Sequence, residues 1–221
     1  MRRLDRDGDR IGTVGAGDVA ELLDRVHSFG TVLLELVVRS LRSLMGHGER
    51  PVGLLPSAAV ATNPSVDLVL HPLDGEARPL GQWLTMFHMA SVVLDPYTNE
   101  SSWILPTAAR ILEGFREADT RANFVVTADA TSARRFIGPL AKRFLVFADP
   151  ARELVKAVGL TELPAFVFLR VDGTVPALAQ GWNANEWRTV AEEIARTTSW
   201  RQPDIPAPGD PGPFHGTPAL A

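Results

Sequence analysis

The sequence predicts an α/β fold: a mixed central sheet flanked by helices, preceded by a mainly helical N-terminal extension. Strand-like and helix-like stretches alternate along the middle of the 221-residue chain, which is typical of a sheet covered by helices on both faces. The segment Ser91–Ala109 joins a continuously apolar strand, an Asp-Pro-Tyr turn and the start of a helix. Asp172-Gly173 separates two β-rich stretches and predicts a hairpin, which adds antiparallel strands. The expected divisions are 1–65 for the extension, 66–200 for the domain and 201–221 for a proline- and glycine-rich tail.

The composition excludes several classes of function. The chain contains no cysteine, which rules out disulfides, thiolate zinc sites, iron–sulfur clusters and thiol catalysis. The formal net charge of -4 gives no general attraction to nucleic acid or to an anionic membrane. The five histidines lack the spacing of metal ligands, so we expect neither a metal nor a cofactor. Thr31–Met45 is too short and too charged to span a bilayer and no signal region is visible, so we expect a cytoplasmic protein.

The extension is expected to form two amphipathic helices. Asp18 and Glu21 have the spacing of a capping box at the start of the first helix. Gly30 ends or bends that helix, and a second apolar stripe follows, with a strand over Val32–Val38 as the open alternative. The apolar face of residues 18–45 favours burial on the domain. A homodimer or partner contact through these helices is the alternative, and a membrane-surface helix is the least favoured.

Turn residues, helix caps and apolar periodicity place the other elements. Asp149 is expected to begin a helix with Pro150 at its first position. Asn183 or Asn185 is expected to cap the last helix, which runs to about Thr197. Strands are expected from 67 to a turn at 74–75, within 83–94, and over 123–127, 144–147, 164–170 and 175–180. Besides the last helix, helices are expected over 98–118, 131–143 and 149–158.

From about Val66 to Thr197 the sequence resembles the thioredoxin-like superfamily, and in particular its longer redoxin branch. Pro106 lies five residues after Ser101, the spacing between the second cysteine of the C-x-x-C motif and a kinking proline in that family. This register places Thr98-Asn99-Glu100-Ser101 on the motif. The resemblance covers neither the N-terminal extension nor the tail.

Three further features carry the resemblance. Leu163-Pro164, followed by a β-rich stretch, is similar to the cis-proline segment that faces the active site in the family. Gly181 precedes the last helix, and Asp172-Gly173 stands at the hairpin turn, as in the family. The resemblance implies a cis peptide bond at Leu163-Pro164.

The chain departs from the family at the residues that carry its chemistry. Dithiol exchange needs a thiolate at the helix N-terminus, whereas the hydroxyls of Thr98 and Ser101 stay protonated. The buried acid of the family is matched by Val92. Thr98 is expected to be a helix N-cap and Glu100 a solvated first-turn acid, because His88 lies too far along the strand to activate a nucleophile. We therefore expect no catalytic residue and no disulfide reductase activity.

In active relatives the groove beside the cis-proline binds an extended peptide through backbone hydrogen bonds, a function that needs no sulfur. The resemblance therefore implies a redox-inactive thioredoxin-like module that binds an unknown protein or peptide, or acts as a scaffold. An enzyme of different chemistry, for example a transferase-like protein that binds a thiol cofactor, and a structural subunit of a complex are the alternatives. The expected groove residues are Tyr97, Thr98, Asn99, Glu100, Ser101, Leu163, Pro164, Gly181 and Trp182.

Overall fold

The computed structural model describes residues 61–220, so the helices expected within residues 18–45 lie outside the described residues. Within this range, seven strands form one sheet in the order β2-β1-β5-β4-β3-β7-β8, and β6 and β9 form a separate pair. The strands are β1 (Val69–Pro72), β2 (Arg78–Pro79), β3 (His88–Leu94), β4 (Thr120–Val126), β5 (Leu145–Ala148), β6 (Glu162–Leu163), β7 (Ala165–Leu169), β8 (Ala177–Gln180) and β9 (Thr217–Pro218). The helices are α2 (Leu80–Trp83), α3 (Asn99–Gly114), α4 (Ala130–Ile137), the 3-10 helix η1 (Gly138–Lys142), α5 (Glu153–Val158) and α6 (Ala184–Thr198).

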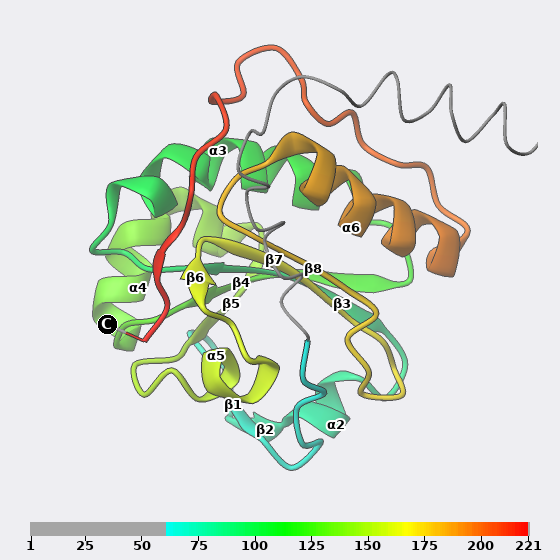
Figure 1. Ribbon diagram of the computed structural model, residues 1–221. Helices are drawn as coiled ribbons and strands as arrows, with labels where there is room; N and C mark the ends of the chain where they lie inside the picture. Colours follow the sequence, from blue (N-terminus) through cyan, green and yellow to red (C-terminus); the bar gives the residue numbers. More distant parts are fainter. Residues whose placement is uncertain (1–60, 221) are drawn as a thin grey trace, which may run out of the picture. The chain divides into compact units, whose positions relative to one another are not determined.

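The central strand β3 connects the parallel and antiparallel parts of the sheet. It pairs in parallel with β4 on one side and antiparallel with β7 on the other. β7 and β8 form the hairpin that Asp172-Gly173 predicts. The mixed sheet flanked by helices is therefore confirmed. β3 leads directly into α3, so the end of a buried strand fixes the position of that helix N-terminus (Figure 1).

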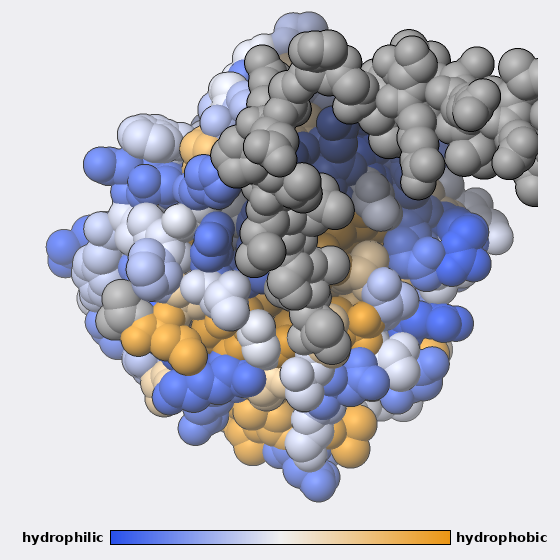
Figure 2. Space-filling view, in the orientation of Figure 1, coloured by the Kyte–Doolittle hydropathy of each residue, from blue (hydrophilic) through white to orange (hydrophobic). Residues whose placement is uncertain are grey.

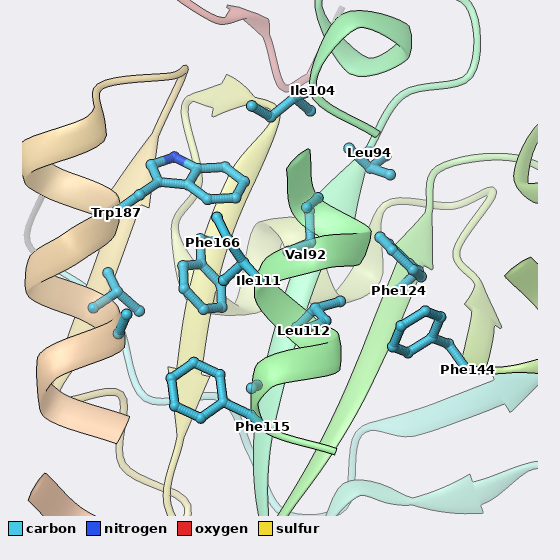
Figure 3. Packing of buried hydrophobic residues seen from close by; sticks show 14 of the residues in the cluster. Val92, Leu94, Ile104, Ile111, Leu112, Phe115, Phe124, Phe144, Phe166 and Trp187 are labelled. Atoms are coloured by element: carbon cyan, nitrogen blue, oxygen red, sulfur yellow. The ribbon is translucent and has the colours of Figure 1, made fainter. Parts of the chain in front are cut away.

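One face of the sheet packs against α3, α4 and α6. Ala90, Val92 and Leu94 of β3 point to this face, where they meet Ile104 and Ile111 of α3. Aromatic rings from the sheet and from α6 complete the packing, as Figure 3 shows for Phe166 and Trp187, whose ring centroids are 5.1 Å apart. Each large side chain buried here contributes about 1.5–3 kcal/mol. Val92 is therefore a core residue, as its side chain predicts.

The opposite face packs against α5 and α2. Met89 and Val93 of β3 alternate along the strand with the residues that face α3, α4 and α6, so they point to this side. They pack with Leu154 and Val155 of α5 and with Leu80 of α2. The two cores fix the sheet from both faces, as the alternation of strands and helices predicts.

Three helices differ from their predicted bounds. The helix expected over 98–118 ends at Gly114, with Phe115 as its C-cap residue. The helix expected at Asp149 begins at Glu153, because the Asp149 carboxylate accepts the backbone N–H groups of Glu153 and Leu154. Arg152 before it has a left-handed backbone, with φ 56°, which a helix cannot continue through. The helix expected over 131–143 is divided at Gly138, whose φ of 57° ends α4 and starts η1.

The tail lies on the domain as an extended strap. It runs past α3 and β6 toward the C-terminus, as the red trace in Figure 1 shows. Just before the tail, the indole N–H of Trp200 donates to the Gly114 carbonyl at the end of α3. Further along, Asp210 forms an ion pair of 2.8 Å with Arg110 of α3. The last part of the tail contains β9, which pairs with β6.

Candidate functional site

The four residues at the C-x-x-C positions lie where β3 gives way to α3. Thr98 is the N-cap residue of α3, as predicted, with an extended backbone at φ -116° and ψ 147°. Its side chain does not cap the helix: the hydroxyl contacts the Asp95 carbonyl at 3.0 Å and the Ser101 hydroxyl at 3.1 Å. Ser101 is fully buried, and its oxygen accepts the Asp95 N–H at 2.9 Å. Both hydroxyls are therefore used in a local network that fixes the strand-to-helix turn.

No base contacts these hydroxyls among the hydrogen bonds of residues 61–220. His88 lies at the opposite end of β3, and its Nδ1 accepts the backbone N–H of Val171 at 3.1 Å. Burial, followed by the nearby Arg170, lowers the pKa of His88 from its ordinary value, so its neutral form is favoured. The arrangement supplies no activated nucleophile at Thr98 or Ser101.

A partly buried ion pair lies beside the C-x-x-C positions. Asp95 Oδ2 is 2.8 Å from Arg152 Nη2, and the two side chains are 8% and 17% exposed. The other oxygen of the Asp95 carboxylate accepts the backbone N–H of Tyr97 at 3.0 Å. Arg152 also donates to the carbonyl oxygen of Ala219 in the tail, at 2.7 Å. One guanidinium thus joins the turn before α3 to the end of the tail.

The tail also covers the cis-proline segment. The peptide bond between Leu163 and Pro164 is cis, as the resemblance implies. Leu163 belongs to β6, which pairs antiparallel with β9, so Leu163 lies opposite Thr217 of the tail. The Thr217 hydroxyl donates to the Leu163 carbonyl at 3.2 Å. An extended segment of this chain therefore lies beside the cis-proline, where the resemblance implies that relatives bind an extended peptide.

Gly181 and Trp182 lie under the same strap. Trp182 pairs with Phe214 through two backbone hydrogen bonds of 2.9 Å. Its side chain is 1% exposed, and its indole N–H donates to the Pro211 carbonyl at 2.8 Å. Gly181 has a φ of 65°, and a Cβ there would lie 2.8 Å from the nitrogen of Gly216. The tail therefore passes at backbone contact distance, and Trp182 is a core residue under it.

Large apolar side chains remain exposed around this region. Tyr97 is 72% exposed and Trp103, one turn into α3, is 55% exposed. The Trp103 ring meets Phe214 of the tail edge to face, with centroids 5.7 Å apart. Leu220, next to Ala219, is 58% exposed, and Figure 2 shows an apolar area next to the end of the tail. Such a group of exposed aromatic and aliphatic side chains is typical of recognition surfaces.

The structure brings the nine predicted groove residues to one region, in two groups. Tyr97, Thr98, Asn99, Glu100 and Ser101 lie at the N-terminus of α3, where Tyr97 and Asn99 are exposed. The other group, Leu163, Pro164, Gly181 and Trp182, lies against the tail.

Sequence reasoning missed the residues that join the two groups. Asp95 and Arg152 are 57 residues apart in the chain, and no spacing pattern links them. Phe214 and Gly216 lie in a stretch that proline and glycine content assigns to a tail. The one local signal was Gly216 itself, a glycine within an extended segment, which often marks close backbone approach.

Residues 61–220 contain no group of acidic and histidine side chains arranged to hold a metal ion. No helix in the same range is long and apolar enough to cross a membrane.

Comparison with known proteins identifies the fold. No known family matches this sequence, and no curated protein does. A protein described as a thioredoxin from Neisseria meningitidis superposes with a TM-score of 0.52 at 13% identity, over 62% of this chain and 93% of that chain. A mutant of peroxiredoxin Q from Xanthomonas campestris gives a TM-score of 0.51 at 16% identity, over 65% of this chain and 98% of that chain. A Chlorobium tepidum protein described as the thiol:disulfide interchange protein DsbE gives 0.50 at 14% identity, over 64% and 99%. The chain has a thioredoxin-like fold without the C-x-x-C cysteines.

Proposed function

We propose that this chain is a redox-inactive thioredoxin-like binding module that holds an extended segment of a partner protein beside Leu163-Pro164. Its own tail is the resident occupant of that groove, and the partner segment takes the place of the tail. The exposed side chains of Tyr97 and Trp103 provide the adjoining contact area.

The observation that carries the proposal is the antiparallel pairing of β6 with β9. Glu162 lies opposite Pro218 and Leu163 opposite Thr217, in the register of a two-stranded sheet. An edge that accepts one extended segment through backbone groups offers the same groups to another. No thiol takes part in these contacts, so the absence of cysteine leaves this function intact.

Tethering explains how a resident tail and a partner can share one groove. A segment attached through a short flexible linker has an effective concentration of about 1 mM at its own site. A partner therefore has to bind more tightly than the tail, or act on a chain whose tail is released. The tail thus prevents peptides of low affinity from binding in the groove, whereas a peptide of sufficient affinity displaces it.

The experiment measures binding of the tail segment in trans. A protease site is inserted between Gly212 and Pro213, both exposed, in the full chain. After cleavage and dialysis, a fluorescent peptide of residues 213–221 is added and its anisotropy is followed. We expect saturable one-to-one binding, and a scrambled peptide of the same composition serves as the control. Absence of binding, or equal binding of the scrambled peptide, would overturn the proposal.

A further inference from the structure

We infer that the groove selects a segment with the pattern aromatic-x-Gly-Thr-x-small, the pattern of the tail from Phe214 to Ala219. The inference rests on the proposed function and adds the chemistry of the partner. Each fixed position of the pattern has a separate structural cause, whereas His215 and Pro218 are exposed, with no side-chain hydrogen bond in the described range.

The glycine position is set by backbone contact on two sides. A Cβ on Gly216 would lie 2.8 Å from Glu162 Cβ and 2.9 Å from the Leu163 carbonyl oxygen. From the other side, the Gly181 backbone approaches the Gly216 nitrogen, as described above. The Gly216 N–H also donates to the Glu162 carboxylate at 3.0 Å. Any side chain here would push the segment out of hydrogen-bonding register, so the groove excludes every residue except glycine.

The aromatic position is set by Trp103 and Trp182. The Phe214 backbone exchanges two hydrogen bonds with Trp182, which fixes the direction of its side chain. That side chain then meets the exposed Trp103 ring at an interplanar angle of 78°. An edge-to-face aromatic pair contributes beyond the area that it buries. An aliphatic residue at this position would lose that contribution.

The last two positions are set by β6 and by Arg152. The Thr217 hydroxyl donates to the Leu163 carbonyl, a bond that valine cannot make. Ala219 is 0% exposed and belongs to the core between the sheet and α5. Its N–H donates to the Thr161 carbonyl at 2.8 Å, and its own carbonyl accepts from Arg152. A larger side chain would overpack this core. Arg152, oriented by Asp95, therefore recognises the end of the segment through its backbone.

The test is competition on the cleaved full chain. The labelled peptide of residues 213–221 is bound first, and unlabelled variants of that peptide are then titrated against it. We expect Gly216→Ala and Ala219→Leu to bind at least about tenfold more weakly than the wild-type peptide. Phe214→Ala and Thr217→Val should weaken binding by about three- to tenfold. His215→Ala is the matched control and should stay within about twofold.

The outcomes separate this inference from the proposed function. Equal competition by all variants, while the wild-type peptide still binds and the scrambled one does not, would overturn the pattern and leave the proposed function standing. Failure of the wild-type peptide to bind would overturn both. A loss of binding for His215→Ala as large as that for Phe214→Ala would also overturn the pattern.

Discussion

Arg152 and the buried Asp95 form an ion pair of 2.8 Å that links α5 to the turn in front of α3. The same guanidinium donates to the Ala219 carbonyl, so the pair also holds the end of the tail. Three segments that are far apart in the sequence therefore meet at one side chain. Arg152 adopts a left-handed backbone at φ 56° to reach them, which for a non-glycine residue costs about 1 kcal/mol.

Removal of this side chain should destabilise the fold. We expect Arg152→Ala to lower the free energy of unfolding by about 3 kcal/mol, because Asp95 is left buried without its partner. Arg152→Gly removes the same pair but relieves the backbone, so it should be about 1 kcal/mol more stable than Arg152→Ala. Urea unfolding measures both. Arg135→Ala, at an exposed arginine with no ion pair among the described residues, is the control. Equal stability of Arg152→Ala and Arg135→Ala would contradict the role of the pair.

Gly216→Ala in the intact chain should release the end of the tail. The added Cβ would meet the backbone of Leu163, which cannot move aside as a flexible side chain would. We expect carboxypeptidase to remove the tail at least about tenfold faster than from the wild type. Gly212→Ala is the matched control, because a Cβ there has nothing within 4 Å. Similar digestion rates for the two variants would argue against a close backbone contact at Gly216.

Cysteines introduced at the motif positions should give a poor reductase. In a Thr98→Cys/Ser101→Cys variant the tail still covers the edge at Leu163, and Val92 supplies no proton acceptor. We expect slow reduction of a protein disulfide with dithiothreitol as the electron source. Adding Gly216→Ala should raise the rate at least about fivefold by freeing the groove. A rate that does not respond to this third change would show that the tail does not obstruct the motif.

The stability of the fold should fall in mild acid through His88. Burial lowers the pKa of His88 on folding, so the native state prefers the neutral ring whose Nδ1 accepts from Val171. Its contribution is therefore complete above the unfolded pKa of about 6.5 and is lost as the pH falls through the folded value. Urea midpoints at about pH 7.5 and 5.5 should decrease more for the wild type than for His88→Asn, which keeps an acceptor but does not titrate. Parallel pH profiles would exclude His88 as the cause.

Much of the fold follows from local sequence signals. The apolar strand ending at Leu94, the spacing of Pro106 from Ser101 and the turn at Asp172-Gly173 are short-range patterns with direct structural meanings. They predict the position of α3 and the hairpin, whereas the cis-proline segment was predicted from the resemblance. The start of α5 escaped prediction because no local sequence signal marks the left-handed backbone of Arg152, a non-glycine residue.

The sequence located only part of the candidate site. The motif positions and Leu163-Pro164 are adjacent or regularly spaced, so the resemblance locates them. The segment Phe214–Ala219, which lies beside Leu163, has no such spacing. Its proline and glycine content predicts only an extended tail. The pairing of Leu163 with Thr217 spans 54 residues and depends on backbone groups, which every residue carries. Trp182 was expected to supply apolar contact area; in the structure it is 1% exposed, and its backbone and indole N–H contact Phe214 and Pro211 of the tail.

The amide proton of Trp182 tests the central claim most directly. In the intact chain this N–H donates to the Phe214 carbonyl at 2.9 Å, so its hydrogen exchange reports whether a segment lies in the groove. Cleavage between Gly212 and Pro213 followed by dialysis should accelerate exchange at Trp182, and adding the peptide of residues 213–221 should slow it again. We expect this reversal with the wild-type peptide and not with the scrambled one. A hydrogen-exchange rate at Trp182 that changes with neither the cleavage nor the peptide would contradict the binding of an extended segment at this site.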